Sequence, residues 1–338
     1  MPVAAKLTAP RTVEIARRPP LQPGPMEVVV GVEAAGICGT DLALFRGDYP
    51  VPLPLVPGHE FAGTVRKLGS GVDPAWLGRR VTAEINNTCL AYHRPKLCSA
   101  CARSLPSHCL DRTVTGIIRH DGAFADEIAV PAGALHTLPD GLDAVTAALA
   151  EPLAAALETF VMSPAAKGDL VVVLGPGRLG VLIVFAARQK GLRVVAISRS
   201  EQKRARSLAF GAEAAFAPHQ AIEAIHAMTG GMGADIVVDA TGHTEGLTQA
   251  LKLVRPRGTL AAKTTCGLPP EGFDLTRLVV DEIRLQGSRC GPFTPALKLL
   301  ARHPEKLRGL ITSTRPLAEA QEALCTADQE NKVVLISG

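Results

Sequence analysis

The glycine-rich segment at residues 171–191 restricts the possible folds of this chain more than any other feature. It reads VVVLGPGRLGVLIVFAARQKG, with three glycines in G-x-G-x-x-G spacing between an apolar run and a helix-forming run. In a strand–turn–helix the first glycine permits a tight turn, the second lets the backbone approach a pyrophosphate, and the third allows close packing. Glycines also occur in ordinary turns, so the flanking strand and helix are what favour dinucleotide binding. The expected contacts are Gly175, Gly177, Arg178, Leu179 and Gly180.

Apolar strands alternate with helices through the second half of the chain. Candidate strands lie at residues 169–175, 192–198, 213–218, 234–242, 258–264 and 282–287. Strands that are apolar on both faces are typical of a parallel sheet covered by helices and joined by right-handed crossovers. Six such strands predict an α/β domain with a Rossmann doubly wound parallel sheet over residues 147–289.

Residues 1–146 follow a different pattern, with short β-rich runs separated by Pro and Gly turns. This pattern is typical of an irregular β-rich domain. A chain of 338 residues exceeds what one hydrophobic core usually serves. We expect the mixed helix and strand of residues 290–338 to rejoin the first domain.

Charge and hydropathy exclude several function classes. Lys and Arg number 36 against 32 Asp and Glu, and no dense basic run suggests nucleic acid as a partner. The N-terminal MPVAAKLTAPRTVEIARRPP lacks the apolar core of a signal peptide, and no uninterrupted apolar span of membrane length follows. We therefore expect a cytoplasmic protein that acts on a small molecule, with neither a membrane nor a nucleic acid as partner.

The end of the second strand of the parallel sheet indicates which coenzyme binds. An NAD site would place Asp or Glu there to bind the ribose 2′-hydroxyl. Here the strand ends at Ser198, and Arg199, Lys203 and Arg204 follow. A guanidinium can bind a 2′-phosphate bidentately, and no carboxylate repels it. NADP is expected rather than NAD, with contacts from Ser198, Arg199 and Lys203, although Arg199 as a solvated residue at a helix start is the alternative.

Metal-ligand side chains occur in two places. Cys38 follows a strand, and His59 and Glu60 follow a Pro-rich loop; a Cys, a His and a carboxylate from separate segments suit a catalytic zinc with one open position. Four of the eight cysteines lie within residues 89–109. In a reducing compartment such clusters are more often metal ligands or catalytic groups than disulfides.

Five motifs in this order, GICGTD, PGHEFAGTV, the clustered cysteines, AEPLAAALE and GPGRLG, resemble the zinc-containing medium-chain alcohol dehydrogenase family along essentially the whole chain. Within it, the polyol, threonine and glucose dehydrogenase branch is the nearest in pattern. The resemblance implies a GroES-like fold for the β-rich domain and zinc-dependent hydride transfer between an alcohol and NADP(H). It also implies a homodimer or homotetramer.

The resemblance assigns roles around the catalytic zinc. Cys38, His59 and Glu60 match the family's zinc ligands, and Asp41 matches the acid that orients a ligand imidazole. Glu151 stands where the polyol, sugar and threonine branches have a glutamate that approaches the metal. This implies a polyol or a functionalised secondary alcohol as substrate, although Glu151 could instead cap the helix that spans the domains.

Thr40 matches the hydroxyl that takes the proton of the substrate alcohol. Many members of the family then pass this proton to a His five residues after the first ligand Cys, where this chain has Ala43. Ribose hydroxyls and water are the remaining route. Elsewhere, Thr241 resembles a turn residue near the coenzyme, and Arg289 could contact a coenzyme phosphate or the domain cleft.

The clustered cysteines only partly match the family's structural zinc lobe. Cys98, Cys101 and Cys109 reproduce the spacing of the last three ligands, but Pro95 takes the place of the first. Cys89 lies six residues further back, so the sequence LAYHRP reads as an insertion. Modest lengthening of a loop costs little closure entropy, so Cys89 is the expected fourth thiolate.

Alternatives remain open for this cluster and for the protein. His93 and His108 are rival fourth ligands, and a redox relay is a further interpretation of the cysteines. A quinone or enoyl reductase on the same scaffold is one rival function, but those branches lack the zinc ligands. An NADPH-binding sensor or structural protein without turnover is another, which the missing relay His leaves open.

Overall fold

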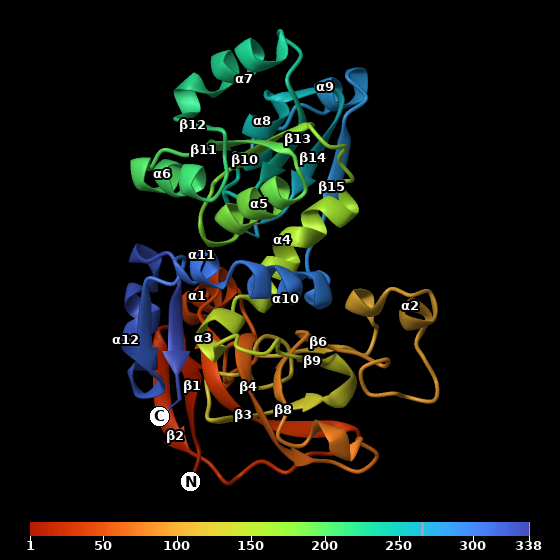
Figure 1. Ribbon diagram of the computed structural model, residues 1–338, viewed down its shortest axis with the longest axis vertical. Helices are drawn as coiled ribbons and strands as arrows, with labels where there is room; N and C mark the ends of the chain where they lie inside the picture. Colours follow the sequence, from red (N-terminus) through yellow and green to blue (C-terminus); the bar gives the residue numbers. More distant parts are fainter. Residues whose placement is uncertain (265–266, 338) are drawn as a thin grey trace. The chain divides into compact units, whose positions relative to one another are not determined.

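The computed structural model describes residues 1–264 and 267–337 (Figure 1). The chain forms two compact units, Met1–Glu151 with Phe293–Gly338, and Pro152–Pro292. The first unit contains both ends of the chain, and the second is a single continuous segment.

The second unit is built on a six-stranded parallel sheet in the order β12-β11-β10-β13-β14-β15. This order confirms the predicted doubly wound sheet. All five residues of β10 are buried, as expected for a central strand covered on both faces. The strands are β10 (Leu170–Leu174), β11 (Arg193–Ile197), β12 (Ala214–Phe216), β13 (Ala234–Asp239), β14 (Val254–Ala262) and β15 (Arg284–Gly287).

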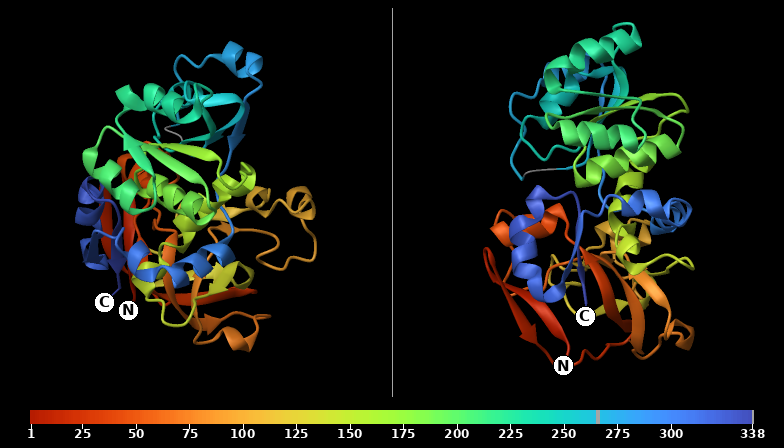
Figure 2. Two further views of the ribbon diagram at one scale, coloured as in Figure 1. Left: turned by 45° about the horizontal axis from the view of Figure 1, so that its top comes forward. Right: turned by 60° about the vertical axis from the view of Figure 1, so that its left-hand side comes forward.

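Helices cover both faces of this sheet (Figure 2). Helix α5 contacts β10 and β11, and α8 contacts β13 and β14, so each connection packs onto the strands that it joins. The helices are α4 (Ala150–Met162), α5 (Arg178–Gln189), α6 (Glu201–Ala209), α7 (Ala221–Thr229), α8 (Gly246–Leu251) and α9 (Leu275–Val280), with the short 3-10 helix η4 (Pro218–Gln220).

The first unit contains a mixed sheet in the order β16-β17-β3-β4-β5-β9, with β8 also paired to β3. Strand β17, from the C-terminal end of the chain, pairs with β3 from the N-terminal part, and β16 pairs with β17 on its other side (Figure 1). The strands of this unit are β1 (Val3–Ala9), β2 (Thr12–Arg17), β3 (Glu27–Gly36), β4 (Glu60–Leu68), β5 (Arg80–Ala83), β6 (Asn86–Asn87), β7 (Thr113–Val114), β8 (Glu127–Pro131), β9 (Leu135–Thr137), β16 (Ser313–Pro316) and β17 (Val333–Ile336).

Short helices connect these strands. The α-helices are α1 (Gly39–Arg46), α2 (Ser99–Ala102), α3 (Ala144–Ala147), α10 (Phe293–Arg302), α11 (Pro304–Arg308) and α12 (Ala320–Thr326). The 3-10 helices are η1 (Pro74–Trp76), η2 (Pro106–His108), η3 (Ala132–Ala134), η5 (Leu317–Glu319) and η6 (Ala327–Gln329). Within the described residues, the stretch Ala144–Met162 is long and apolar enough to cross a membrane, but 72% of its apolar 18-residue window is buried inside the protein. Its apolar composition is that of a core helix.

Strand pairing brings the predicted catalytic residues together. In the β3–β4 pair Gly36 lies opposite Glu60, and Cys38 follows β3 two residues later. A Cβ at Gly36 would lie 2.5 Å from the Glu60 carboxylate and 2.9 Å from the Lys332 side chain, so the close approach requires glycine. The end of β3 is therefore shaped for the side chains of β4 and of the segment that precedes β17.

Candidate functional site

The three predicted ligands of a catalytic zinc converge in the first unit. Cys38 is the N-cap of α1, Glu60 is the first residue of β4, and His59 directly precedes that strand. One ligand atom from each lies within 4.8 Å of the others, and His59 and Glu60 are only 3% and 1% exposed. A thiol, an imidazole and a carboxylate that meet in a buried place form a donor set that fits zinc.

Asp41 holds two of these ligands in place. Its carboxylate accepts the backbone N–H of Cys38 at 2.7 Å and that of Gly58 at 3.1 Å, and it lies 3.4 Å from Nδ1 of His59. Nδ1 does not meet the geometry of a hydrogen bond to any described group. Burial lowers the pKa of His59, but the carboxylate of Asp41 and the contact with Cys38 outweigh it, so this pKa lies well above its ordinary value. Because Nδ1 faces Asp41, Nε2 is left to bind a metal.

Lys332 is a functional residue that the sequence analysis missed. Its ammonium donates to Oε2 of Glu60 and, at 3.1 Å, to the carbonyl oxygen of Ile37. Lys332 and Glu60 are 3% and 1% exposed, so this is a buried ion pair. The only sequence signal is a lone Lys directly before the apolar run VVLI, and its partner becomes evident only when β17 pairs with β3.

Thr40 and Glu151 are the other predicted catalytic residues. Thr40 is in the first turn of α1, two residues after Cys38, and its side chain is half-buried. Ala43 lies one turn further along the same helix. Glu151 is 8% exposed in the first turn of α4, but among the described residues it is not part of the group within 4.8 Å.

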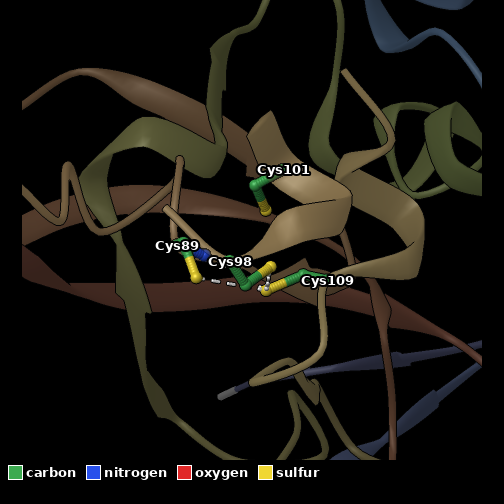
Figure 3. Close-up of side chains that lie close together, drawn as sticks. All are labelled: Cys89, Cys98, Cys101 and Cys109. Carbon is green, nitrogen blue, oxygen red and sulfur yellow. Dashed lines mark hydrogen bonds between the residues drawn. The ribbon is translucent and has the colours of Figure 1, made fainter. Parts of the chain in front are cut away.

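The four clustered cysteines face a common space (Figure 3). Their sulfur atoms lie within 4.8 Å of one another. The distance from Sγ of Cys109 to Sγ of Cys89 is 3.4 Å and to Sγ of Cys98 is 3.7 Å, which is too long for a disulfide. In the described part of the chain the group contains Cys89 and neither His93 nor His108. Four converging thiols fit a closed structural zinc site.

Contacts inside this lobe shift the pKa values of its cysteines in opposite directions. The backbone N–H groups of Cys101 and, at 3.4 Å, of Leu110 bond to the Cys98 sulfur and lower the pKa of Cys98 to about 6, which favours the thiolate. Burial raises the pKa of Cys89 and of Cys101. The inserted loop is held by Tyr92, whose hydroxyl donates to Oε1 of Glu27 at 3.0 Å. The guanidinium of Arg94 lies over the Tyr92 ring at 5.6 Å.

The glycine-rich loop has the geometry of a phosphate cradle. Gly175 has a φ of +74°, and a Cβ there would lie 2.8 Å from the backbone of Thr241. A Cβ at Gly180 would lie 2.4 Å from the carbonyl oxygen of Gly175, whereas a Cβ at Gly177, the N-cap of α5, would meet nothing within 4 Å. Packing therefore requires glycine at positions 175 and 180, whereas Gly177 leaves open space at the start of α5. Such space is what the approach of a pyrophosphate to this turn would need.

The end of β11 presents two exposed cations. Ser200 caps α6 by accepting the N–H of Lys203 at 3.3 Å. Arg204 donates to the carbonyl oxygens of Ser198 and Arg199 at 2.7 and 3.0 Å, and so braces the turn. The side chains of Arg199 and Lys203 are exposed, and neither shows a hydrogen bond or ion pair to another described residue. They are free to meet an anion.

Asp239, which the sequence analysis also missed, organises the turn after β13. Its Oδ1 accepts the backbone N–H of Thr241 at 2.9 Å and the hydroxyl of Thr241 at 2.7 Å. The hydroxyl proton of Thr241 is thus used within the turn. The sequence did carry a signal for this role of Asp239, because an Asp ends the strand and Ala-Thr-Gly follows it.

Arg289, a further predicted coenzyme contact, is exposed two residues after β15.

Comparison with known proteins decides the family. Residues 24–140 match the alcohol dehydrogenase GroES-like domain, and residues 179–302 match the zinc-binding dehydrogenase domain. A sorbitol dehydrogenase of Halalkalibacterium halodurans is 31% identical over 316 residues, which cover 91% of this chain and 90% of that protein. The chain belongs to the zinc-binding medium-chain alcohol dehydrogenase family. The predicted family and the GroES-like fold are confirmed.

Further relatives of this zinc-binding dehydrogenase share its full length. The L-threonine 3-dehydrogenase of Bacillus subtilis is 29% identical over 92% of this chain and 91% of the relative. A zinc-binding dehydrogenase of Sinorhizobium meliloti, solved bound to NADP, is 30% identical with a TM-score of 0.88 over 99% of both chains. These similarities place the dehydrogenase in the polyol and threonine branch of its family, as the sequence motifs predicted.

Proposed function

We propose that this dehydrogenase oxidises polyols or functionalised secondary alcohols with NADP⁺ and reduces the matching carbonyls with NADPH. The observation that carries the proposal is the buried convergence of Cys38, His59 and Glu60 within 4.8 Å. The open cradle at Gly177 supports coenzyme binding. Relatives that act on sorbitol, D-arabitol phosphate and erythritol or L-threitol support the polyol class.

In this proposal each catalytic residue of the first unit has a defined task. Cys38, His59 and Glu60 would hold a zinc ion, with Glu151 approaching it, and such an ion supplies Lewis acidity that lowers the pKa of an alcohol. Asp41 fixes the His59 ring and the backbone at Cys38.

Proton movement is the second task. The hydroxyl of Thr40 accepts the proton of the substrate alcohol and relays it. Ala43 has no group that can carry the proton further, so the proton leaves through ribose hydroxyls and water. The hydride, with its electron pair, goes from the substrate carbon to the nicotinamide ring.

The preference for NADP is part of the proposal. Arg199 and Lys203 are exposed beside the end of β11, where the ribose 2′-group of a dinucleotide binds. The NADP-bound Sinorhizobium meliloti structure supports this choice. The remaining proposed coenzyme contacts are Gly175, Gly177, Arg178, Leu179, Gly180, Ser198, Thr241 and Arg289.

A second zinc, held by Cys89, Cys98, Cys101 and Cys109, is proposed to stabilise the lobe without taking part in chemistry.

We also assign catalysis to residues 1–146 and 290–338, and coenzyme binding to residues 147–289. These assignments fall within five residues of the boundaries between the two compact units. The cytoplasm is the proposed location.

We propose a second copy of the chain as partner, giving a homodimer or homotetramer. Among the described residues strand β15 is one edge of the parallel sheet, and Leu285 within it is 48% exposed. Leu275, Val279 and Val280 of α9 are 64%, 64% and 72% exposed. An unpaired edge with exposed apolar side chains is suited to pairing with another chain. Light scattering that showed only monomers would reject this partner.

Turnover with a panel of polyols and secondary alcohols tests the function. We expect NADP⁺ reduction in the zinc-replete protein, and a loss of roughly 1000-fold in kcat/KM in Cys38→Ser, because the zinc's thiolate ligand is removed. Cys325→Ser, at an exposed cysteine of α12, is the control and should retain full activity. Tight NADPH binding without turnover on any substrate would instead support the sensor alternative.

A further inference from the structure

A surface hollow lies in the first unit, away from the catalytic group. Its volume is about 530 Å³, which is the size of a small-molecule site. Met26, directly before β3, lines this hollow, whereas Cys38 follows the other end of the same strand. Because a strand rises about 3.3 Å per residue, the two ends of β3 are on the order of 30 Å apart. The residues that line the hollow include Met26, Gly71, Asp73, Trp76, His93 and Gly133.

The inserted loop after Cys89 forms one wall of the hollow, through His93. This loop is docked closely on the neighbouring wall. The backbone N–H of Gly133 donates to the carbonyl oxygen of Ala91 at 3.1 Å, and a Cβ at Gly133 would lie 2.6 Å from that oxygen. Since the insertion departs from the family's spacing, this wall is a feature of this chain and not of the shared catalytic machinery.

Met26 is held in the hollow by its neighbours. Gly71 has a φ of +82°, and a Cβ there would lie 2.7 Å from the sulfur of Met26. Met26 and His93 have φ values of +60° and +48°, which are costly for residues other than glycine and persist only where the surroundings fix them. The backbone of Met26 is fixed by hydrogen bonds of 2.8 Å to Ser70 and to Ala132. The hollow is therefore formed by ordered contacts.

Asp73 and Trp76 determine the chemistry of the hollow. Asp73 is the only Asp, Glu, Lys or Arg that lines it. Its Oδ1 accepts the backbone N–H of Ala75 at 2.9 Å, but among residues 1–264 and 267–337 the carboxylate has no ion-pair partner. Trp76 is half-buried, and in the described part of the chain no cation lies over its ring. A carboxylate beside an indole ring and the thioether of Met26 is a combination that attracts organic cations.

We propose that this hollow binds an organic ammonium ion. The carboxylate of Asp73 balances the charge of the ion, while the ring of Trp76 and the sulfur of Met26 contact its carbon atoms. The imidazole of His93 can accept a hydrogen bond from an ammonium that carries an N–H. Asp73 repels an anion, and a neutral ligand leaves its charge unbalanced. This binding site goes beyond the proposed dehydrogenase chemistry, because it lies at the opposite end of β3 from the proposed zinc ligands.

Titration with tetramethylammonium chloride at constant ionic strength tests the proposal. Trp76 is the only tryptophan of the chain, so its fluorescence reports on the hollow. We expect a saturable change with a Kd of about 1 mM, which is reasonable for so small a ligand. tert-Butanol has a similar size but no charge and no hydride to donate, and it should bind at least about tenfold more weakly. The absence of saturation by tetramethylammonium, or an equal affinity for tert-butanol, would overturn the proposal.

Asp73→Asn separates the charge of the carboxylate from its structural contact. The amide keeps the oxygen that accepts the N–H of Ala75, so the turn is retained while the charge is lost. We expect this variant to bind tetramethylammonium at least about tenfold more weakly and tert-butanol as before. Asp140→Asn, at an exposed position outside the hollow, makes the same charge change and should bind normally. An unaltered affinity in folded Asp73→Asn would reject the site.

Two further variants locate the bound ion by calorimetry, which does not depend on the tryptophan signal. Trp76→Leu keeps an apolar side chain but removes the ring, so the binding heat of tetramethylammonium should be lost. If Asp73→Asn does not fold, binding heat that persists in Trp76→Leu overturns the proposal instead. Cys38→Ser should bind the ion as the unaltered protein does. Loss of binding in Cys38→Ser would assign the ion to the catalytic group and contradict a separate site.

Discussion

At the scale of single residues, Glu60 has two possible cationic partners, Lys332 and a bound metal. Its Oε2 bonds to the ammonium of Lys332, which also donates to the carbonyl oxygen of Ile37. A buried carboxylate needs a counter-charge, because its desolvation is otherwise uncompensated. Lys332 therefore stabilises Glu60 in the metal-free protein, and a zinc ion would take over part of that role.

Replacement of Lys332 by Met would leave Glu60 buried without this ammonium. We expect the free energy of unfolding of the metal-free protein to fall by roughly 3 kcal/mol, and by less in the presence of zinc, because the ion pairs with the carboxylate. Chemical denaturation with and without zinc measures both values. Lys298→Met, on the exposed face of α10, is the control and should change stability by less than about 0.5 kcal/mol. An equal loss with and without zinc would argue against Glu60 as a ligand.

Arg199 is expected to determine the choice of coenzyme. In Arg199→Asp the carboxylate repels the 2′-phosphate, so kcat/KM with NADP⁺ should fall at least about tenfold while that with NAD⁺ rises. Steady-state kinetics with both coenzymes provides the measurement. Lys190→Asp, at the opposite end of α5, reverses a charge away from the phosphate site and should leave the coenzyme ratio unaltered. The NADP assignment fails if Arg199→Asp also keeps that ratio.

At the scale of elements, the parallel sheet was predictable and several side-chain partners were not. The central strand β10 is buried along its whole length, as its apolar run predicts, whereas the edge strands β12 and β15 are not. The strand order also agrees with the predicted doubly wound sheet. Lys332 and Glu60 are 272 positions apart, and no local pattern indicates that strand pairing joins them. The inserted loop after Cys89 departs from the family's spacing, and its contacts, such as those of Tyr92 with Glu27 and of Arg94 with Tyr92, show how the chain accommodates it.

The cysteine lobe should behave as a stability element. Cys101→Ser removes one of four thiolates, and we expect the unfolding temperature to drop by about 5 °C or more and the zinc content to fall by about one per chain. Turnover per catalytic zinc at low temperature should persist. Ser99→Ala, in the same short helix α2, retains all four sulfurs and serves as the control. Loss of turnover in a folded Cys101→Ser variant with its catalytic zinc retained would contradict a purely structural role.

At the scale of the whole molecule, the first unit depends on both ends of the chain. Strand β17 pairs with β3, and this places Lys332 beside Glu60 in a unit that also holds both proposed zinc groups. The second unit carries the glycine-rich loop and the exposed Arg199. Metal chemistry and coenzyme recognition are therefore separable by mutation.

Anomalous diffraction at the zinc edge, from crystals of the active protein, tests the central claim most directly. The account predicts one zinc peak between Cys38, His59 and Glu60, and a second among the four clustered cysteines. A metal-replete protein that oxidises alcohols but shows no zinc at Cys38 and His59 would contradict it.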